Sequence, residues 1–309
     1  MSAPADRVTR TSVDTAELLL PGAWRHRFVA ANGARFHVAE AGEGPLVLLL
    51  HGFPQFWWAW RRQLAPIAAA GFRAVAMDLR GYGASDKPPR GYDTVTLAAD
   101  VAGVIRALGE PHAVVVGHDW GGWLAWSMPA LAPGVTRAVA IASMAHPLEM
   151  RSALIDSRQR RAAARVLAFQ TPIRPERWLV NRDGVGTLLR DWGGPGYPDP
   201  ETAEVYQRAI RVPFVAHTSL EYFRWAFRSL PRPDGRRFAA AVGQAITVPV
   251  LHLHGERDPF VLTETAWLSR SRVRGPFRWH LVPGVGHFLP EEAPDTVTAA
   301  LLGWLADLT

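Results

Sequence analysis

The chain has 309 residues, 48% hydrophobic and 20% charged, so it can bury a sizeable core as one domain or as one domain carrying an insertion. It contains no cysteine, which excludes disulfides, thiolate metal sites and a cysteine nucleophile. The formal net charge is +6, but the arginines are spread along the chain among acidic residues, so no nucleic-acid partner is predicted.

No stretch approaches the roughly 18 unbroken apolar residues of a membrane span, so no membrane partner is predicted. Residues 1–20 lack a basic region followed by an apolar run, and we therefore expect no secretory signal. The expected location is the cytoplasm. Composition does not determine the oligomeric state, for which a homodimer is one alternative.

Eight segments read as strands. The first two flank Asn32-Gly33, a pair that favours a tight hairpin turn. Several later segments are continuously apolar, as is typical of parallel strands buried on both faces. The predicted strands cover residues 25–30, 34–40, 46–50, 73–77, 113–116, 137–143, 250–253 and 278–282.

Helical patterns alternate with these strands. They cover residues 58–70, 96–108, 120–131, 263–269 and 295–306. Alternation of this kind predicts an α/β fold with a mostly parallel, eight-stranded sheet flanked by helices.

The alternation stops between residues 147 and 245, a stretch rich in Arg and Trp with helical patterns and no clear buried strand. We interpret it as a helical cap inserted after the sixth strand. The predicted domains are therefore a core made of residues 1–146 and 246–309, and a cap made of residues 147–245.

Polar motifs follow five of the predicted strands directly. Ligands of open α/β sheets bind outside the carboxyl ends of the strands, so these motifs predict a site at that edge. They are His51-Gly52-Phe53-Pro54-Gln55, Asp78-Leu79-Arg80-Gly81-Tyr82-Gly83-Ala84-Ser85-Asp86, Gly117-His118-Asp119-Trp120-Gly121-Gly122, Gly255-Glu256-Arg257-Asp258 and Gly284-Val285-Gly286-His287-Phe288.

The glycines two residues before and after Asp119 match the nucleophile elbow G-x-S-x-G, with aspartate in place of serine. Asp258 and His287 follow in the order nucleophile, acid, histidine. Taken singly, Asp119 could be a helix N-cap, Asp258 the start of a turn and His287 a core histidine, but the order and the strand context favour catalysis. No group of residues has convincing metal-ligand spacing.

An aspartate nucleophile indicates a particular chemistry. A carboxylate that attacks a saturated carbon forms an ester, which water can cleave, whereas serine would form a stable ether. Aspartate is also ionised at pH 7, with a reference pKa of about 3.9, so the first step needs no base. The residue therefore points to leaving groups such as an epoxide oxygen or a halide.

His287, held by Asp258, is expected to act in the second step by taking a proton from the water that attacks the ester. The resulting oxyanion needs hydrogen-bond donors. The backbone N–H groups of Phe53 and Trp120 are the candidates, and each such donor is typically worth roughly 3–4 kcal/mol.

From about Trp24 to Leu305 the chain resembles the epoxide hydrolase branch of the α/β-hydrolase superfamily, on the strand-end motifs given above. The resemblance implies a cis peptide bond between Phe53 and Pro54, a small apolar epoxide as substrate together with water, and no metal or organic cofactor.

In that family, cap tyrosines give acid assistance to epoxide opening. Tyr206 resembles the second of them, while the segment resembling that of the first holds no tyrosine and has Arg165 at the best-matched position. Tyr222 and Tyr197 are the alternatives. The resemblance also implies that Trp120, Phe53, Pro54 and Tyr222 contact the substrate.

A haloalkane or haloacid dehalogenase would use the same Asp119, His287 and Asp258. Dehalogenases cradle the halide with the tryptophan after the nucleophile, here Trp120, and a second donor, for which Trp178, Trp192 or Trp225 are candidates. Their usual asparagine is replaced by Phe53, and the arginine that follows the nucleophile in fluoroacetate dehalogenases is replaced by Trp120. A non-catalytic hydrolase-fold receptor is a further alternative, which the complete triad disfavours.

Overall fold

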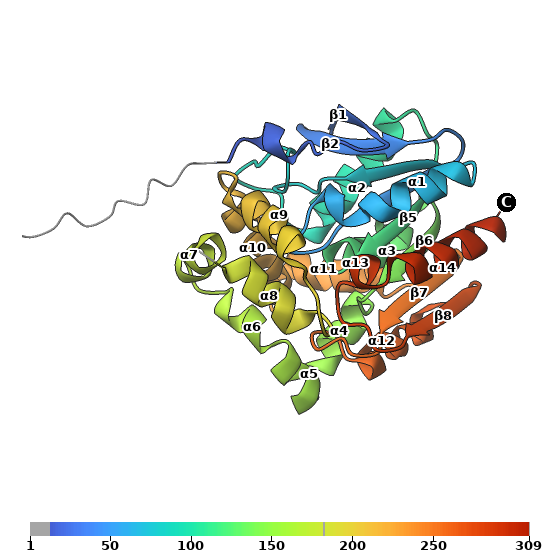
Figure 1. The fold of residues 1–309 in the computed structure, drawn as a ribbon. Helices are drawn as coiled ribbons and strands as arrows, with labels where there is room; N and C mark the ends of the chain where they lie inside the picture. The colour runs from blue at the N-terminus through green and yellow to red at the C-terminus, as the bar shows by residue number, and fades with distance from the viewer. Residues whose placement is uncertain (1–12, 182, 309) are drawn as a thin grey trace, which may run out of the picture.

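The computed structural model describes residues 13–181 and 183–308 (Figure 1). One sheet of eight strands runs in the order β1-β2-β4-β3-β5-β6-β7-β8. β2 is antiparallel to both its neighbours and the other pairs are parallel, which confirms the predicted sheet. The strands are Arg25–Ala31 (β1), Ala34–Ala41 (β2), Leu46–Leu50 (β3), Arg73–Met77 (β4), Ala113–His118 (β5), Thr136–Ala142 (β6), Val250–Gly255 (β7) and Phe277–Val282 (β8).

Each strand lies within two residues of its predicted ends. The agreement has a physical reason: β3, β5 and β7 lie inside the sheet and are buried at every residue, so their sequences are mostly apolar, with His118, His252 and His254 as the exceptions. The hairpin of β1 and β2 turns at Asn32 and Gly33, both of which have positive φ, as a tight turn of this type requires.

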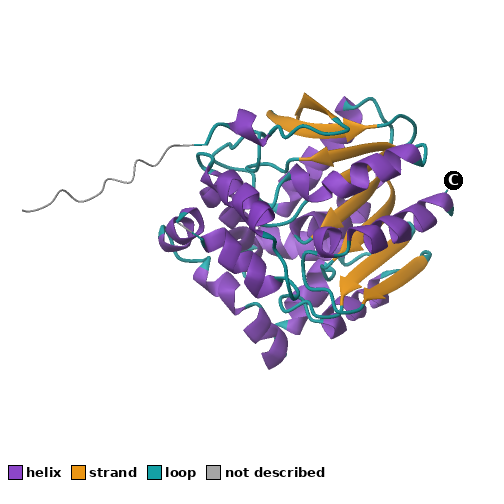
Figure 2. Cartoon of the chain, in the orientation of Figure 1, coloured by secondary structure: helices purple, strands orange, loops and turns teal. Residues whose placement is uncertain are grey.

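Helices cover both faces of the sheet (Figure 2). The start of the first predicted helix, residues 58–60, belongs instead to a 3-10 turn over residues 57–60, and the α-helix begins at Arg61. The second begins at Thr94, two residues early, because Asp93 caps it by accepting the N–H of Thr96. The core helices are Arg61–Ala69 (α1), Thr94–Ala107 (α2), Trp120–Leu131 (α3), Thr263–Leu268 (α12), Leu289–Glu292 (α13) and Pro294–Ala306 (α14), with 3-10 turns Thr15–Leu18 (η1), Trp57–Trp60 (η2), Pro133–Val135 (η3) and Ser269–Arg272 (η4).

Between β6 and β7 the chain forms helices α4 to α11, which we call the cap region. Its described residues contain no strand. The division of the chain into a core domain and a cap domain remains a prediction. Residues 1–12 and 309, at the outer ends of the predicted core domain, lie outside the described residues. The helices are Pro147–Ala153 (α4), Ser157–Ala162 (α5), Ala164–Ala168 (α6), Arg174–Val180 (α7), Gly184–Trp192 (α8), Pro200–Arg211 (α9), Val215–Arg228 (α10) and Pro233–Val242 (α11).

The cap region lies at the carboxyl ends of the parallel strands. In Figure 2 the arrowheads of β7 and β8 point toward the side of the molecule on which α5 to α8 lie in Figure 1. The hydroxyls of Thr218 and Tyr222, both on α10, donate to the carbonyl oxygens of Gly81 and Arg80, each at 2.7 Å. The cap region therefore closes over the edge where the sequence places the polar motifs.

Within the described ranges no helix is long and apolar enough to cross a membrane. The same residues contain no group of three or more His, Asp or Glu side chains arranged to hold a metal ion. Most of the stretch on which we expect no secretory signal lies outside the described residues, and the cytoplasmic location remains a prediction.

Candidate active site

Asp119 lies at a sharp turn between β5 and α3, with φ 47° and ψ −113°. Positive φ strains a residue with a Cβ, and such strain is typical of functional turns. A Cβ on Gly117 would lie 2.0 Å from the carbonyl oxygen of Gly121, and one on Gly121 would lie 2.1 Å from that of Leu50. The turn therefore requires both glycines, and the predicted elbow geometry is present.

The Asp119 carboxylate is fully buried, and its two oxygens have different surroundings. Oδ2 accepts the backbone N–H of Phe53 at 2.8 Å. Oδ1 has no hydrogen-bond partner and lies 3.6 Å from Nε2 of His287. One oxygen is thus fixed by the backbone, and the other is free to react.

His287 lies between the two carboxylates that the sequence selects. Its Nδ1 donates to Oδ2 of Asp258 at 2.8 Å, and its Nε2 faces Asp119 without a hydrogen-bond partner. The other oxygen of Asp258 accepts the N–H groups of Phe260 and Val261 at 2.8 and 2.9 Å. The structure therefore brings together three residues that are 29 or more positions apart along the chain.

Burial alone would lower the pKa of His287, because the charged ring loses its hydration. The charge of Asp258 and the contacts with Asp119 outweigh that loss and raise the pKa of His287 to about 10. Burial would likewise raise the pKa of Asp258, but the charge of His287 holds it below its usual range. At neutral pH the ring is therefore an imidazolium.

Replacing Asp119 with asparagine is expected to lower the pKa of His287 from about 10, because the variant lacks one of the charges that raise it. Since the fold favours the protonated ring, its stabilising effect is complete below the ordinary pKa of 6.5 and is lost as the pH rises through about 10. NMR titration of the His287 ring in both proteins measures the shift. An unchanged pKa would contradict the proposed electrostatic contact.

The backbone around His287 is held by hydrogen bonds to residues that the sequence did not indicate. Glu292 accepts the N–H groups of Gly286 and Phe288, both at 2.8 Å, and also that of Gly194 in the cap region at 2.8 Å. The N–H of His287 donates to the carbonyl oxygen of Trp192 at 3.0 Å. The cap region thus takes part in positioning the histidine.

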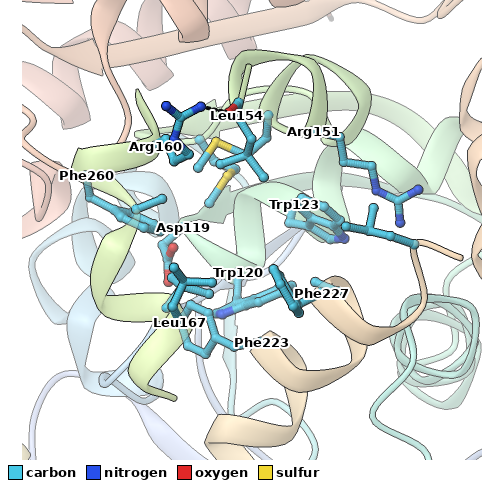
Figure 3. Close-up of a pocket in the computed structure, with 16 residues that line it drawn as sticks. Asp119, Trp120, Trp123, Arg151, Leu154, Arg160, Leu167, Phe223, Phe227 and Phe260 are labelled. Carbon is cyan, nitrogen blue, oxygen red and sulfur yellow. Dashed lines mark hydrogen bonds between the residues drawn. The ribbon is translucent and has the colours of Figure 1, made fainter. Parts of the chain in front are cut away.

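A cavity of about 280 Å³ opens beside Asp119 (Figure 3). Its lining includes Trp120 and Trp123 from the core, Phe223 and Phe227 from α10, and Phe260 from the loop after β7. Among the described residues that line it, Asp119 is the only carboxylate. The cavity suits a small apolar molecule that reacts with this carboxylate.

Phe53 and Trp120 both lie at Asp119. The N–H of Trp120 belongs to the first turn of α3, where N–H groups have no acceptor within the helix. The indole Nε1 of Trp120 is buried without an acceptor, and its ring lines the cavity. The peptide bond between Phe53 and Pro54 is cis, as the resemblance implies.

The cap tyrosines are not brought to the cavity. The hydroxyls of Tyr206 and Tyr197 donate to Oε2 of Glu291 at 2.7 and 2.8 Å, and that of Tyr222 donates to the carbonyl oxygen of Arg80. All five tyrosines of the chain are among the described residues, and none lines the cavity. The predicted acid and the predicted tyrosine contact to the substrate therefore have no geometric support.

Arg165 and the three tryptophans considered as a second halide donor also lie outside the cavity lining. Arg165 forms an ion pair with Asp191. Trp192 stacks on Phe260 with ring centroids 4.3 Å apart, and its edge meets the ring of His287. Neither Trp178 nor Trp225 lines the cavity. No pattern in the sequence distinguishes these positions, because their orientation depends on how the cap helices pack.

Comparison with known proteins gives a consistent result. A family model described as the alpha/beta hydrolase fold matches residues 45–294. Epoxide hydrolase A of Mycobacterium tuberculosis is 33% identical over 93% of this chain and 99% of its own length. Among solved structures, epoxide hydrolase A of Mycobacterium thermoresistibile is 29% identical with a TM-score of 0.73, covering 92% of this chain and 98% of the other. An epoxide hydrolase of Bacillus megaterium is 26% identical with a TM-score of 0.80, covering 91% and 100%.

Proposed function

The chain belongs to the α/β-hydrolase fold family, in its epoxide hydrolase branch, and we propose that it opens an epoxide to a vicinal diol through a covalent ester on Asp119. One observation carries the proposal: a buried aspartate at a strained elbow faces an apolar cavity and has a histidine paired with a second carboxylate behind it. Water is the second reactant, and no metal or organic cofactor is needed.

In the first step Oδ1 of Asp119 attacks a ring carbon of the epoxide. The carbon–oxygen bond of the ring breaks, an ester bond forms, and the ring oxygen becomes an alkoxide. Oδ1 is suited to this role because it has no hydrogen-bond partner, whereas Oδ2 is held by the N–H of Phe53. The indole N–H of Trp120 supplies a hydrogen bond to the departing oxygen.

The alkoxide needs a proton, and the protonated ring of His287 is its source. Ester formation neutralises Asp119, which removes one of the causes that raise the pKa of His287 to about 10. The ring therefore loses a proton as the alkoxide gains one. This leaves His287 neutral, which is the state in which it can act as a base.

In the second step neutral His287 takes a proton from water, and the hydroxide attacks the carbonyl carbon of the ester. Negative charge then develops on Oδ2, which already accepts the N–H of Phe53 and which the N–H of Trp120 assists. The bond between the acyl carbon and the alkyl oxygen breaks, and the leaving alkoxide takes the proton of the new Asp119 carboxylic acid and departs as the diol. Asp119 is again a carboxylate, and His287 is again protonated.

Replacing Tyr206 with phenylalanine tests whether Tyr206 or His287 donates the proton to the alkoxide. Because its hydroxyl is committed to Glu291, we expect the rate of ester formation to stay within about threefold and the stability to fall by about 1 kcal/mol. Single-turnover kinetics and thermal melting measure both. A drop of tenfold or more in ester formation would establish Tyr206 as the acid that the resemblance implies.

Dehalogenation is the second candidate. It is favoured by the unpartnered Nε1 of Trp120 and by the lack of any tyrosine hydroxyl in the cavity lining, since a halide leaves as an anion and needs a hydrogen-bond donor but no proton. The names of the similar proteins favour epoxides, and so we place dehalogenation second.

A matched pair of substrates distinguishes the two functions. The wild-type protein is incubated with a terminal alkyl epoxide and with the 1-bromoalkane of the same chain length. Epoxide hydrolysis predicts diol from the first, measured by chromatography, and no bromide from the second. Bromide release without diol formation would replace the proposed function with dehalogenation.

A further inference from the structure

Arg151, on α4, is one of the residues that line the cavity. Its Nε and Nη2 are buried and have no hydrogen-bond partner. Nη1 reaches only the carbonyl oxygen of Gly235, at a long 3.5 Å, and the guanidinium carbon lies 5.3 Å from the ring centroid of Phe238. Neither contact neutralises the charge.

The arginines that are buried in the described chain have carboxylate partners. Arg80 is paired with Asp100 at 2.6 Å, and Arg224 is paired with Glu176 at 2.7 Å. Among the described residues no Asp or Glu lies within 4.0 Å of the Arg151 guanidinium, and Glu149, two positions earlier, is paired with Arg272. Arg151 is therefore a half-buried cation whose two buried donor atoms, Nε and Nη2, have no partner among the described residues.

Burying the donor atoms of a charged group without a hydrogen-bond partner destabilises a fold, even where the rest of the side chain reaches solvent. Such a charge is explained where a ligand supplies the missing partner. We propose that the cavity binds a substrate bearing a carboxylate, and that Arg151 pairs with it. The inference rests on the proposed function and names its substrate class.

The arrangement of the cavity orients such a molecule. Asp119 and Arg151 lie on opposite sides of it in Figure 3, with Trp123 drawn between them. A carboxylate is repelled by Asp119 and attracted by Arg151, so the reactive carbon is directed to Asp119 and the anionic end to Arg151. The largely apolar lining between them accommodates the alkyl part.

A carboxylate fits this position better than a phosphate. A guanidinium binds a carboxylate through two parallel N–H bonds, and Arg151 has two unused donor atoms, Nε and Nη2. A doubly charged phosphate would lose far more hydration on entering a cavity of about 280 Å³ with apolar walls. Arg160 also lines the cavity, but its Nη1 already donates to the carbonyl oxygens of Leu154 and Ile155.

Equilibrium binding tests the inference without catalysis. Calorimetry compares octanoate with 1-octanol on the wild type, on Arg151→Met and Arg151→Lys, and on Arg158→Met as a control, because Arg158 is an exposed arginine paired with Glu264 outside the cavity. We expect the wild type and Arg158→Met to prefer octanoate by about ten- to a hundredfold. Arg151→Met should lose that preference without a lower melting temperature, and Arg151→Lys should keep part of it.

Kinetics supply the second test. For a terminal epoxide joined by an alkyl chain to a carboxylate, Arg151→Met should raise KM about tenfold or more with kcat little changed, while the epoxide ending in a methyl group should be unaffected. Equal effects on both substrates, or no preference for octanoate in the wild type, would overturn the inference and leave the proposed function standing. Octanoate binding that depends on Arg151, without turnover of either epoxide, would support the anion site and reject epoxide hydrolysis.

Discussion

Replacing Asp119 with alanine is expected to reduce diol formation on the order of 10⁴-fold or more, because the attacking atom is removed and no other carboxylate of the described chain lines the cavity. The fold should survive the change. The carboxylate is buried, it has one oxygen without a partner, and its backbone is strained, so the melting temperature is expected to stay level or rise. Steady-state assays and thermal melting measure the two effects.

Asp307→Ala is the matched control for that variant. Asp307 forms an exposed ion pair with Arg278, and neither residue belongs to the cavity lining. It should retain wild-type activity. An Asp119→Ala protein that keeps more than about a hundredth of the activity would show that water attacks the epoxide directly, with Asp119 only assisting.

Replacing His287 with glutamine is expected to stop turnover after the first step. Asp119 still attacks, because a carboxylate needs no base and water can protonate the alkoxide in place of His287, but no group remains to activate water for the ester. Turnover should fall by roughly 10³- to 10⁴-fold, and the protein should gain the mass of one intact epoxide. Intact-protein mass spectrometry measures the gain, and peptide mapping places it on Asp119.

His112→Gln is the control, because His112 is exposed and lies outside the cavity lining. This protein should turn over normally and carry no added mass. A His287→Gln protein that loses activity without gaining mass would mean that His287 is needed before the ester forms, which contradicts the order of steps proposed above.

The core of the fold could be predicted because buried parallel strands have a recognisable, mostly apolar sequence. β3 and β5 are apolar at nearly every position since both faces of the sheet are covered, and the polar residues that follow them mark the carboxyl edge. The elbow around Asp119 was also accessible, because the geometry of the turn excludes any side chain at Gly117 and Gly121.

The cap region could not be predicted in the same way. Its helices are short and amphipathic, so the direction of a given side chain depends on packing that no local pattern records. Tyr206 illustrates this: its segment resembles a catalytic one, yet its hydroxyl points to Glu291, a residue 85 positions away. Arg151 is a second example, because the sequence does not reveal that no carboxylate among the described residues lies beside its guanidinium.

The connection between the cap region and His287 was likewise invisible in the sequence. The carbonyl of Trp192 and the N–H of Gly194 reach the histidine loop, the first directly and the second through Glu292. Trp192 is the last residue of α8 and Gly194 lies in the loop that follows it, and no local pattern in the sequence indicates either contact. The position of the His287 loop therefore depends on the packing of the cap region.

The central claim is that the oxygen added to the substrate comes first from Asp119 and not from water. A single turnover in water labelled with oxygen-18, with enzyme in excess over epoxide, tests it directly. The account predicts an unlabelled diol and one oxygen-18 atom in the Asp119 carboxylate, because water attacks the ester carbonyl. A labelled diol with an unlabelled Asp119 would contradict it.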